Sequence, residues 1–449
     1  MVVILVAAVG LYTGKRVKSA GDFLLAGRSM GPGMIAGSML GTLIGGSTTI
    51  GTAEMAFKYG FASWWWALGL SGGCLILALV VSPSLHRYRM STIGDFLERA
   101  YGRRTKVVAS AILLPAMSLT LVPNVLSALA ILSSVSRLPT PILGAIALGA
   151  MVAYVVFGGV WGACTVGIVK VLLISLTVAA SAAVAVFDAG GFGGIIRALP
   201  AHPWFSLFGR GFWVDLGAGL GTALGVVGTQ VYLQIAASAR DHESARRGIL
   251  WSGVFSALLG LFSVFVGLGV RASDPTARAA QVLPTLILTR FPPLLAGIGL
   301  GALFIAVLGS ASGVALGIGT LVASDLLGEK AYERIRPRFG SDGRLLVARA
   351  AVFMALSAGV FAGSVIKPAF ILDWAFLSMG LRVASVTPPF IAGVLFRERL
   401  GRHSGMAGML GGITAMLLTL ILRPGGDVVF PSLAASIICI ALASLVPDR

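Results

Sequence analysis

Two basic side chains fall inside apolar stretches of the sequence, where a charge has chemical consequences. Lys170 lies in the apolar run 163–187, and Arg382 lies in the run 368–396. A charge near the centre of a bilayer costs at least ~2.5–3.5 kcal/mol on insertion scales, so such residues are functional candidates by default. An ammonium can stand in for a bound cation or carry a proton, and a guanidinium can bind a carboxylate.

Arg382 and two further polar side chains within apolar runs each allow two interpretations. Arg382 either binds a solute carboxylate or belongs to an outer gate, or it forms a structural pair with Asp373 or caps carbonyl groups. Asn124, between Pro115 and Pro123, either contacts solute or restores hydrogen bonds that the prolines remove. Glu54 either extends toward the membrane surface or binds a cationic solute.

Two glycine-rich segments interrupt the apolar runs that should hold these side chains. Residues 37–51 contain five glycines and the three hydroxyl residues Ser47, Thr48 and Thr49. Residues 217–230 are glycine-rich as well and end in Gly228-Thr229-Gln230. Small residues also mediate ordinary helix packing in membranes. Because both segments occupy matching positions, we expect two broken helices whose free backbone groups form a binding site, with the three hydroxyls and Asn124 contacting solute.

The composition indicates a polytopic membrane protein. Hydrophobic residues make up 57% of the 449-residue chain and charged residues only 11%, with a formal net charge of +17. Soluble domains carry about 25% charged residues, so a water-soluble enzyme is excluded, as is a disordered chain. Three isolated cysteines and four scattered histidines predict neither a zinc site nor a disulfide framework. The basic excess fits cytoplasmic loops, and no nucleic-acid partner is expected.

Apolar runs of spanning length predict an all-α fold with about 13 transmembrane helices. The runs are 1–13, 31–57, 62–83, 105–136, 139–158, 163–187, 212–236, 248–270, 294–325, 345–365, 368–396, 404–422 and 428–446. Lys and Arg gather in alternate loops, which predicts an outside N-terminus and a cytoplasmic C-terminus. The high Gly and Ala content suggests a GC-rich bacterial source, hence the bacterial inner membrane.

The positions of the two broken spans predict an internal repeat. Span 7 comes five spans after span 2, and because five is odd the two spans cross the membrane in opposite directions. We therefore expect one membrane domain over 1–449, with a first repeat at 31–187, an inverted second repeat at 212–396, and two additional helices at 404–446.

Six motifs in order make the sequence similar to the sodium:solute symporter family over nearly the whole chain. The motifs are Asp22–Arg28, Thr92–Arg99, Tyr154–Gly159, Gln230–Gln234 followed by Ala245–Gly248, Ala306–Asp325, and Pro388–Gly405. The resemblance implies a five-plus-five inverted-repeat fold and alternating access driven by sodium.

The resemblance also implies a sodium site between spans 2 and 9. Its ligands are backbone carbonyls at Gly41, Ile44 and Ala306 and two adjacent hydroxyls, of which the second matches Ser310. The first hydroxyl falls on Gly309, which has no side chain. The site is therefore degenerate, because sodium prefers several oxygen ligands.

Span 6 departs from the family at two further positions. Gly167 stands where an Asp usually supports the sodium site, and Lys170 stands one turn later where Gln is usual. Two interpretations stay open. Sodium binds with Thr42, Ser312 or water completing its shell, or the Lys170 ammonium occupies its place and the protein couples to protons or to nothing.

The sequence thus predicts a secondary active transporter rather than an enzyme. The expected partners are the lipid bilayer, a coupling Na⁺ or H⁺, and a small organic solute such as an amino acid, an organic acid or a quaternary amine. No cofactor other than sodium is implied. A Na⁺-independent transporter or uniporter using Lys170 is the first alternative, and a membrane sensor without transport is the second. A channel is not expected, because the sequence lacks the repeated polar rings that line a pore. A membrane enzyme is not expected either, because no catalytic groups cluster within the apolar runs.

Overall fold

The computed structural model describes residues 29–88, 92–327, 343–365, 370–396, 400–423 and 425–445. For residues 88, 154–166, 168, 343–345 and 364–365 it describes the backbone only. The predicted first span at 1–13 and the motif Asp22–Arg28 therefore lie outside the described residues, as do the side chains of Tyr154–Gly159.

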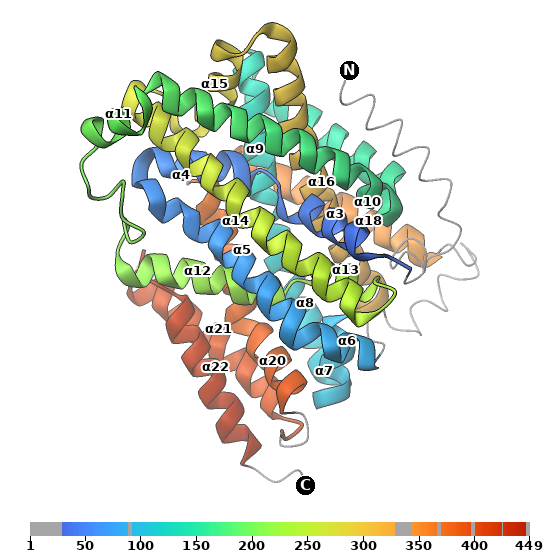
Figure 1. The fold of residues 1–449 in the computed structure, drawn as a ribbon. Helices are drawn as coiled ribbons and strands as arrows, with labels where there is room; N and C mark the ends of the chain where they lie inside the picture. Colours follow the sequence, from blue (N-terminus) through green and yellow to red (C-terminus); the bar gives the residue numbers. More distant parts are fainter. Residues whose placement is uncertain are drawn as a thin grey trace.

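The described chain folds into a bundle of helices, with one isolated bridge between Met30 and Ala239 (Figure 1). The elements of the first half are α3 (Pro32–Leu43), η2 (Ser47–Gly51), α4 (Thr52–Tyr59), η3 (Gly60–Trp64), α5 (Trp65–Ile76), η4 (Leu77–Val81), α6 (Ser82–Tyr88), α7 (Ile93–Tyr101), α8 (Arg103–Leu119), α9 (Leu121–Val135), α10 (Thr140–Asp188) and α11 (Gly191–Ala198).

The second half is helical as well. Its elements are α12 (Phe212–Val227), α13 (Gln230–Ala237), α14 (His242–Ser273), η5 (Ala279–Gln281), α15 (Val282–Arg290), α16 (Pro293–Thr320), η6 (Leu321–Leu326), α18 (Gly343–Val365), α19 (Ile371–Ser385), α20 (Thr387–Leu395), α21 (Ser404–Leu422) and α22 (Val429–Ser444). The helices α21 and α22 pack together at one end of the bundle, beside α19 and α20 (Figure 1).

Local sequence signals account for many helix starts. Proline occupies the first turn of α3, α10, α16 and α20, where its missing N–H would have no helical partner. Thr92 and Asp95 form a reciprocal capping box at the start of α7, and the Asp241 side chain caps α14 through the Ser244 N–H. These motifs lie in the polar segments between apolar runs.

Seven helices in the described residues are long and apolar enough to cross a membrane, or nine if each of two bent pairs is one span. Two shorter apolar helices, Thr140–Ala153 and Val429–Ser444, add to these. The protein is thus an all-helical integral membrane protein, while the expected number of 13 spans and the inverted repeat stay predictions. The loop expected at 159–162 is helical within α10, and these four residues include no proline and no charged residue.

Three helix breaks lie within the bundle. The first separates α3 from η2, where Ile44 has an extended ψ of 97°. The second bends α12 against α13 by 48° at Gly228 and Thr229, and the third bends α19 against α20 by 48° at Val386. The first two lie in the glycine-rich segments that the sequence singles out. The third precedes Pro388 and Pro389, which have no N–H to donate to the carbonyls of the preceding helical turn.

Helix α14 crosses the front of the view in Figure 1 and packs on α3, α4, α5 and α10. Close approach depends on glycines. A Cβ atom at Gly267 would lie 2.5 Å from the Ala53 carbonyl oxygen of α4, and a Cβ at Gly248 would lie 2.7 Å from the Ile35 Cβ of α3. Backbone contact of this kind lets membrane helices pack by van der Waals attraction, since lipid supplies no hydrophobic driving force between them.

We expect Gly267→Ala to lower the thermal stability of the purified protein. The new methyl group must push α14 away from the α4 backbone, at a cost of about 1–3 kcal/mol for overpacking. The matched control is Gly297→Ala on α16, because nothing lies within 4 Å of a Cβ there. The control should leave the melting temperature unchanged or slightly raised. Equal melting temperatures for both variants would contradict the packing described here.

Candidate functional site

The end of α3 presents carbonyl groups that the helix itself cannot pair. The chain turns out of the helix after Leu43, so the last carbonyls lose their N–H partners. Side chains from three other elements bond to them. The Lys170 ammonium donates to Gly41 O, the Ser310 hydroxyl to Thr42 O at 2.9 Å, and the Thr48 hydroxyl to Leu43 O at 2.9 Å. Polar side chains thus replace the backbone donors that the break removes.

Lys170 joins three helices through its ammonium group. It projects from α10, is 2% exposed, and donates to Gly41 O of α3 and to Ala306 O of α16, the latter at 3.2 Å. Among the described residues no carboxylate lies within ion-pair distance of it. The two acceptors are two of the carbonyls that the family resemblance assigns to sodium.

The remaining residues of the expected cation site surround this contact. Ser310 is buried on α16 and its hydroxyl bonds to Thr42 O. Ile44 is buried at the end of α3, and its N–H bonds to Leu40 O at 2.8 Å. Gly309 supplies no hydroxyl. At Gly167 a Cβ would lie 2.6 Å from Gly37 O, so α10 approaches the α3 backbone too closely for an aspartate side chain.

The three hydroxyl residues after the first break are buried in η2. Thr48 bonds to Leu43 O, Thr49 to Gly45 O at 2.9 Å, and the Ser47 carbonyl accepts from the Thr52 hydroxyl at 3.0 Å. The Thr48 oxygen also accepts from the Trp66 indole N–H at 3.2 Å. In this conformation the threonine hydroxyls hold the broken backbone, and Ser47 is 9% exposed.

An aromatic pair covers the first break. Trp66, on α5, is 4% exposed and lies edge-on to Phe376 of α19 with ring centroids 5.6 Å apart. Its position in the run Trp64–Trp66 is typical of a membrane-interface belt. The sequence alone does not distinguish the three tryptophans, because only the tertiary fold turns Trp66 toward Thr48.

Asn124 has one satisfied and one unsatisfied end. Its amide nitrogen donates to Thr120 O at 3.1 Å within the same helical region, while Oδ1 is buried without a hydrogen-bond partner. A Cβ at Gly45 would lie 2.9 Å from that oxygen, so Oδ1 faces the first break. Asn124 therefore both restores a backbone carbonyl and presents a free acceptor.

Arg382 is completely buried where the second and third breaks meet. Its Nη1 donates to the Thr229 hydroxyl at 2.6 Å, and its Nη2 donates to the Thr120 hydroxyl and, at 3.1 Å, to the Ser378 hydroxyl. Nε has no partner. The expected structural pair with Asp373 is wrong, because Asp373 lies 4.0 Å from Arg210 instead. In the described chain Arg382 has no acidic partner.

The hydroxyls around Arg382 were not predicted as site residues. Thr229 follows Gly228 in the second glycine-rich segment, so its position could have been noted. Ser378 lies one turn before Arg382 on α19, so its contact with the guanidinium is a local one. Thr120 carries no local signal, and only packing of α19 on α8 and α9 brings it to the guanidinium.

Glu54 neither extends to the surface nor lies free. Its carboxylate accepts from the Ile371 N–H at 2.9 Å and so caps the first turn of α19.

A second unpredicted cluster lies at the far end of α16. Lys106 contacts Asp95 at 3.0 Å, Glu98 at 2.9 Å and the buried Asp325 at 3.6 Å. This cluster ties α7, α8 and η6 together.

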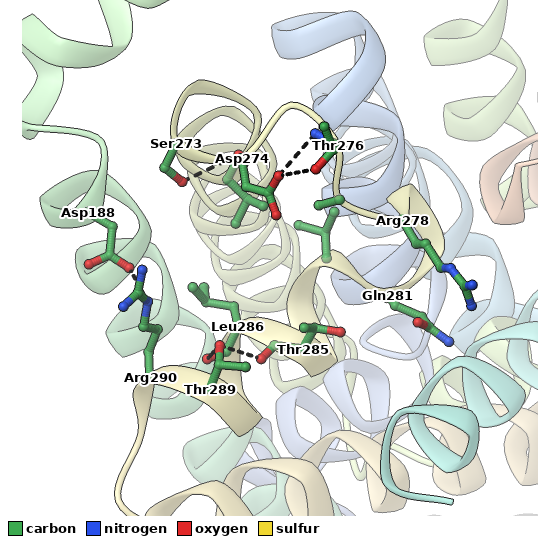
Figure 2. A pocket seen from close by; sticks show the side chains of 13 residues that line it. Asp188, Ser273, Asp274, Thr276, Arg278, Gln281, Thr285, Leu286, Thr289 and Arg290 are labelled. Carbon is green, nitrogen blue, oxygen red and sulfur yellow. Dashed lines mark hydrogen bonds and ion pairs between the residues drawn. The ribbon is translucent and has the colours of Figure 1, made fainter. Parts of the chain in front are cut away.

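A cavity of about 390 Å³ opens elsewhere, at the ends of α10, α14 and α15. Figure 2 shows Asp188 facing Arg290 and Asp274 bonded to Thr276, and the first pair forms an ion pair at 2.8 Å. None of the residues predicted for the cation or solute site lines this cavity. It belongs to the surface rather than to the broken helices.

Comparison with known proteins supports a transporter. The chain is 24% identical to a high-affinity proline transporter of Bacillus subtilis, covering 91% of this chain and 89% of that protein. It is 26% identical to a sodium/pantothenate symporter of Escherichia coli, covering 97% and 92%. Its fold is similar to that of a substrate-bound, outward-open Na⁺-coupled sialic acid symporter, with a TM-score of 0.81 at 18% identity over 99% and 95% of the two chains.

A family model also matches most of the chain. The sequence model of the sodium:solute symporter family covers residues 23–412, which include both glycine-rich segments, Lys170 and Arg382. The chain therefore belongs to the sodium:solute symporter family.

Proposed function

We propose that this protein is a secondary transporter of a small organic solute in which the Lys170 ammonium takes the place of the coupling sodium ion. The observation that carries the proposal is the pair of contacts from Lys170 to Gly41 O and Ala306 O. Transport then proceeds by alternating access without sodium, coupled to protons or driven by the solute gradient alone.

Electrostatics favours the tethered amine over a bound ion. Two unit charges 4 Å apart repel by about 4 kcal/mol at an effective dielectric constant of 20. A sodium ion at these carbonyls would meet that repulsion and would also lack the oxygens that Gly309 and Gly167 cannot supply. The amine is covalently present at every turnover, so it outcompetes an ion that must be taken from solution.

Sodium symport is the second candidate, because the family and the similar transporters are sodium-coupled. Gly41, Ala306 and Ser310 remain in position to offer oxygens, provided that Lys170 turns away. A sensor without transport is the remaining hypothesis. The two transport hypotheses differ in the response to sodium, and the sensor differs from both in the absence of uptake.

The names of the similar proteins suggest a panel of solutes. Proline, pantothenate and sialic acid are candidate solutes for this chain, and choline represents the quaternary amines. Radiolabelled uptake of each into proteoliposomes, with and without a sodium gradient or a pH gradient, tests the transport function. The proposal expects uptake that is unaffected by replacing Na⁺ with K⁺. Absence of uptake for every solute under every gradient would favour the sensor.

Wild-type protein should show no sodium-specific change in thermal stability. A ligand at 100 times its dissociation constant stabilises a protein by roughly 2.7 kcal/mol, which a melting experiment detects readily. Na⁺ is titrated against K⁺ at constant ionic strength. The control variant Lys58→Ala removes an exposed lysine outside the site and should respond to the two ions as wild type does. A saturable rise in melting temperature with Na⁺ but not K⁺ in wild type would contradict the proposal.

Restoring oxygens should restore sodium binding. We expect Lys170→Ala combined with Gly309→Ser to gain a Na⁺-specific rise in melting temperature, because the repulsion is gone and the missing hydroxyl is back. Gly309→Ser alone should gain none. If the single variant responds to sodium as strongly as the double variant, Lys170 does not occupy the ion's place.

A further inference from the structure

We propose that Arg382 and Asn124 form a two-point binding site for a solute that carries a carboxylate together with a hydrogen-bond donor, such as an amino acid or a hydroxy acid. The carboxylate binds the guanidinium and the donor binds the asparagine oxygen. This inference rests on the transport function proposed above and narrows its solute class, since it excludes quaternary amines.

The first argument is an uncompensated charge. Arg382 is fully buried, and the groups that accept hydrogen bonds from its guanidinium in the described chain are three hydroxyls and the Met379 sulfur, all neutral. A charge in a low-dielectric interior is costly unless it meets an opposite charge. The site therefore lacks an anion, and a solute carboxylate supplies one.

The second argument is the state of the guanidinium edge. Nε has no partner, while the adjacent Nη2 bonds only to the Thr120 and Ser378 hydroxyls. A carboxylate binds arginine best through two parallel N–H···O bonds, and Nε with one Nη forms such an edge. On this edge Nε is thus unpaired, and Nη2 bonds to hydroxyls that a carboxylate can replace.

The hydroxyls do not depend on Arg382 for their own hydrogen bonds. Thr229 Oγ1 also bonds to Gly225 O at 2.6 Å, and Ser378 Oγ also bonds to Ala116 O at 2.6 Å. Thr120 Oγ1 lies 2.7 Å from Ser378 Oγ. A carboxylate can therefore displace them from the guanidinium without leaving any of them unpaired.

The third argument is the free acceptor on Asn124. Its amide nitrogen bonds to the Thr120 carbonyl, which only a donor can do, so the other amide atom is the oxygen. That oxygen is buried and unpaired. Thr120 links the two halves of the site, because its carbonyl holds Asn124 and its hydroxyl holds Arg382. A free donor and a free acceptor thus lie on either side of one residue.

The competing explanation is that Arg382 only fastens the broken helices. It does touch α13 through Thr229 and the end of α8 through Thr120. A fastener makes the solute-free protein more stable, whereas a binding group with no counterion makes it less stable. The two explanations therefore predict opposite effects of removing the charge.

The first test measures melting temperatures of solute-free protein. Arg382→Gln keeps donors for the hydroxyls but removes the charge, and the exposed Arg197→Gln is the control. We expect Arg382→Gln to melt at the same temperature as wild type or higher. A clear fall relative to wild type and to the control overturns the proposal. This arm needs no knowledge of the solute.

The second test compares acids with their amides. Proline and pantothenate are each paired with the corresponding amide or alcohol, and binding is followed by thermal shift and by competition for uptake. We expect the acids to bind wild type about tenfold to a hundredfold better than their neutral partners, a preference that Arg382→Gln abolishes. Equal binding of acid and neutral partner, or binding of choline alone, overturns the proposal.

The third comparison separates the two contact points. Asn124→Ala should weaken proline more than N,N-dimethylproline, which lacks the ammonium protons, while leaving the acid preference intact. Equal weakening of both removes Asn124 from the site. The function proposed above fails by a different result, namely sodium-dependent uptake or no uptake. Neither result depends on whether acids bind better than their neutral partners.

Discussion

A helix that breaks inside a bilayer must find new partners for its backbone, and this requirement organises the structure. Water is absent, so each carbonyl without a helical N–H needs a donor from elsewhere in the protein. At the end of α3 the donors are Lys170, Ser310 and Thr48, which come from three different elements. The break therefore gathers α10, α16 and η2 around one point. Binding sites form where such groups converge, because the same carbonyls that need donors can accept a cation.

The two buried cations, Lys170 and Arg382, are stabilised inside the bundle in different ways. Lys170 places its charge against carbonyl oxygens, whose negative ends point toward it, and it holds three helices together. Arg382 is surrounded by hydroxyls, whose dipoles can rotate and which offer no net negative charge. The first environment stabilises a permanent cation, whereas the second leaves a positive charge available to an incoming anion. The difference follows from geometry, since Lys170 faces carbonyls at the end of α3, whereas Arg382 faces side-chain hydroxyls on α19 and at the ends of α8 and α13.

The sequence predicts the broken elements better than it predicts their contacts. Glycine density indicates the breaks near Ile44 and Gly228, and the apolar run 404–422 coincides with α21, because both signals are local. The break at Val386 was missed even though Pro388 and Pro389 mark it, since the surrounding run is long enough for one span. The approach of Lys170 to Gly41 and Ala306 was expected only from a family resemblance. The contacts of Arg382 with Thr120 and Thr229 depend on how α19 packs, which no local pattern contains, whereas Ser378 lies one turn away on the same helix.

The close approach of α10 to α3 couples two positions of the site, Gly167 and Lys170, through one helix contact. Because a Cβ at Gly167 would lie 2.6 Å from the Gly37 carbonyl oxygen, no side chain fits there until the two helices separate. Lys170 draws the same helices together through Gly41. A side chain at position 167 and the Lys170 contact thus make opposite demands on the distance between α3 and α10. Substitutions at the two positions should have non-additive effects on stability, because both act on the same helix contact.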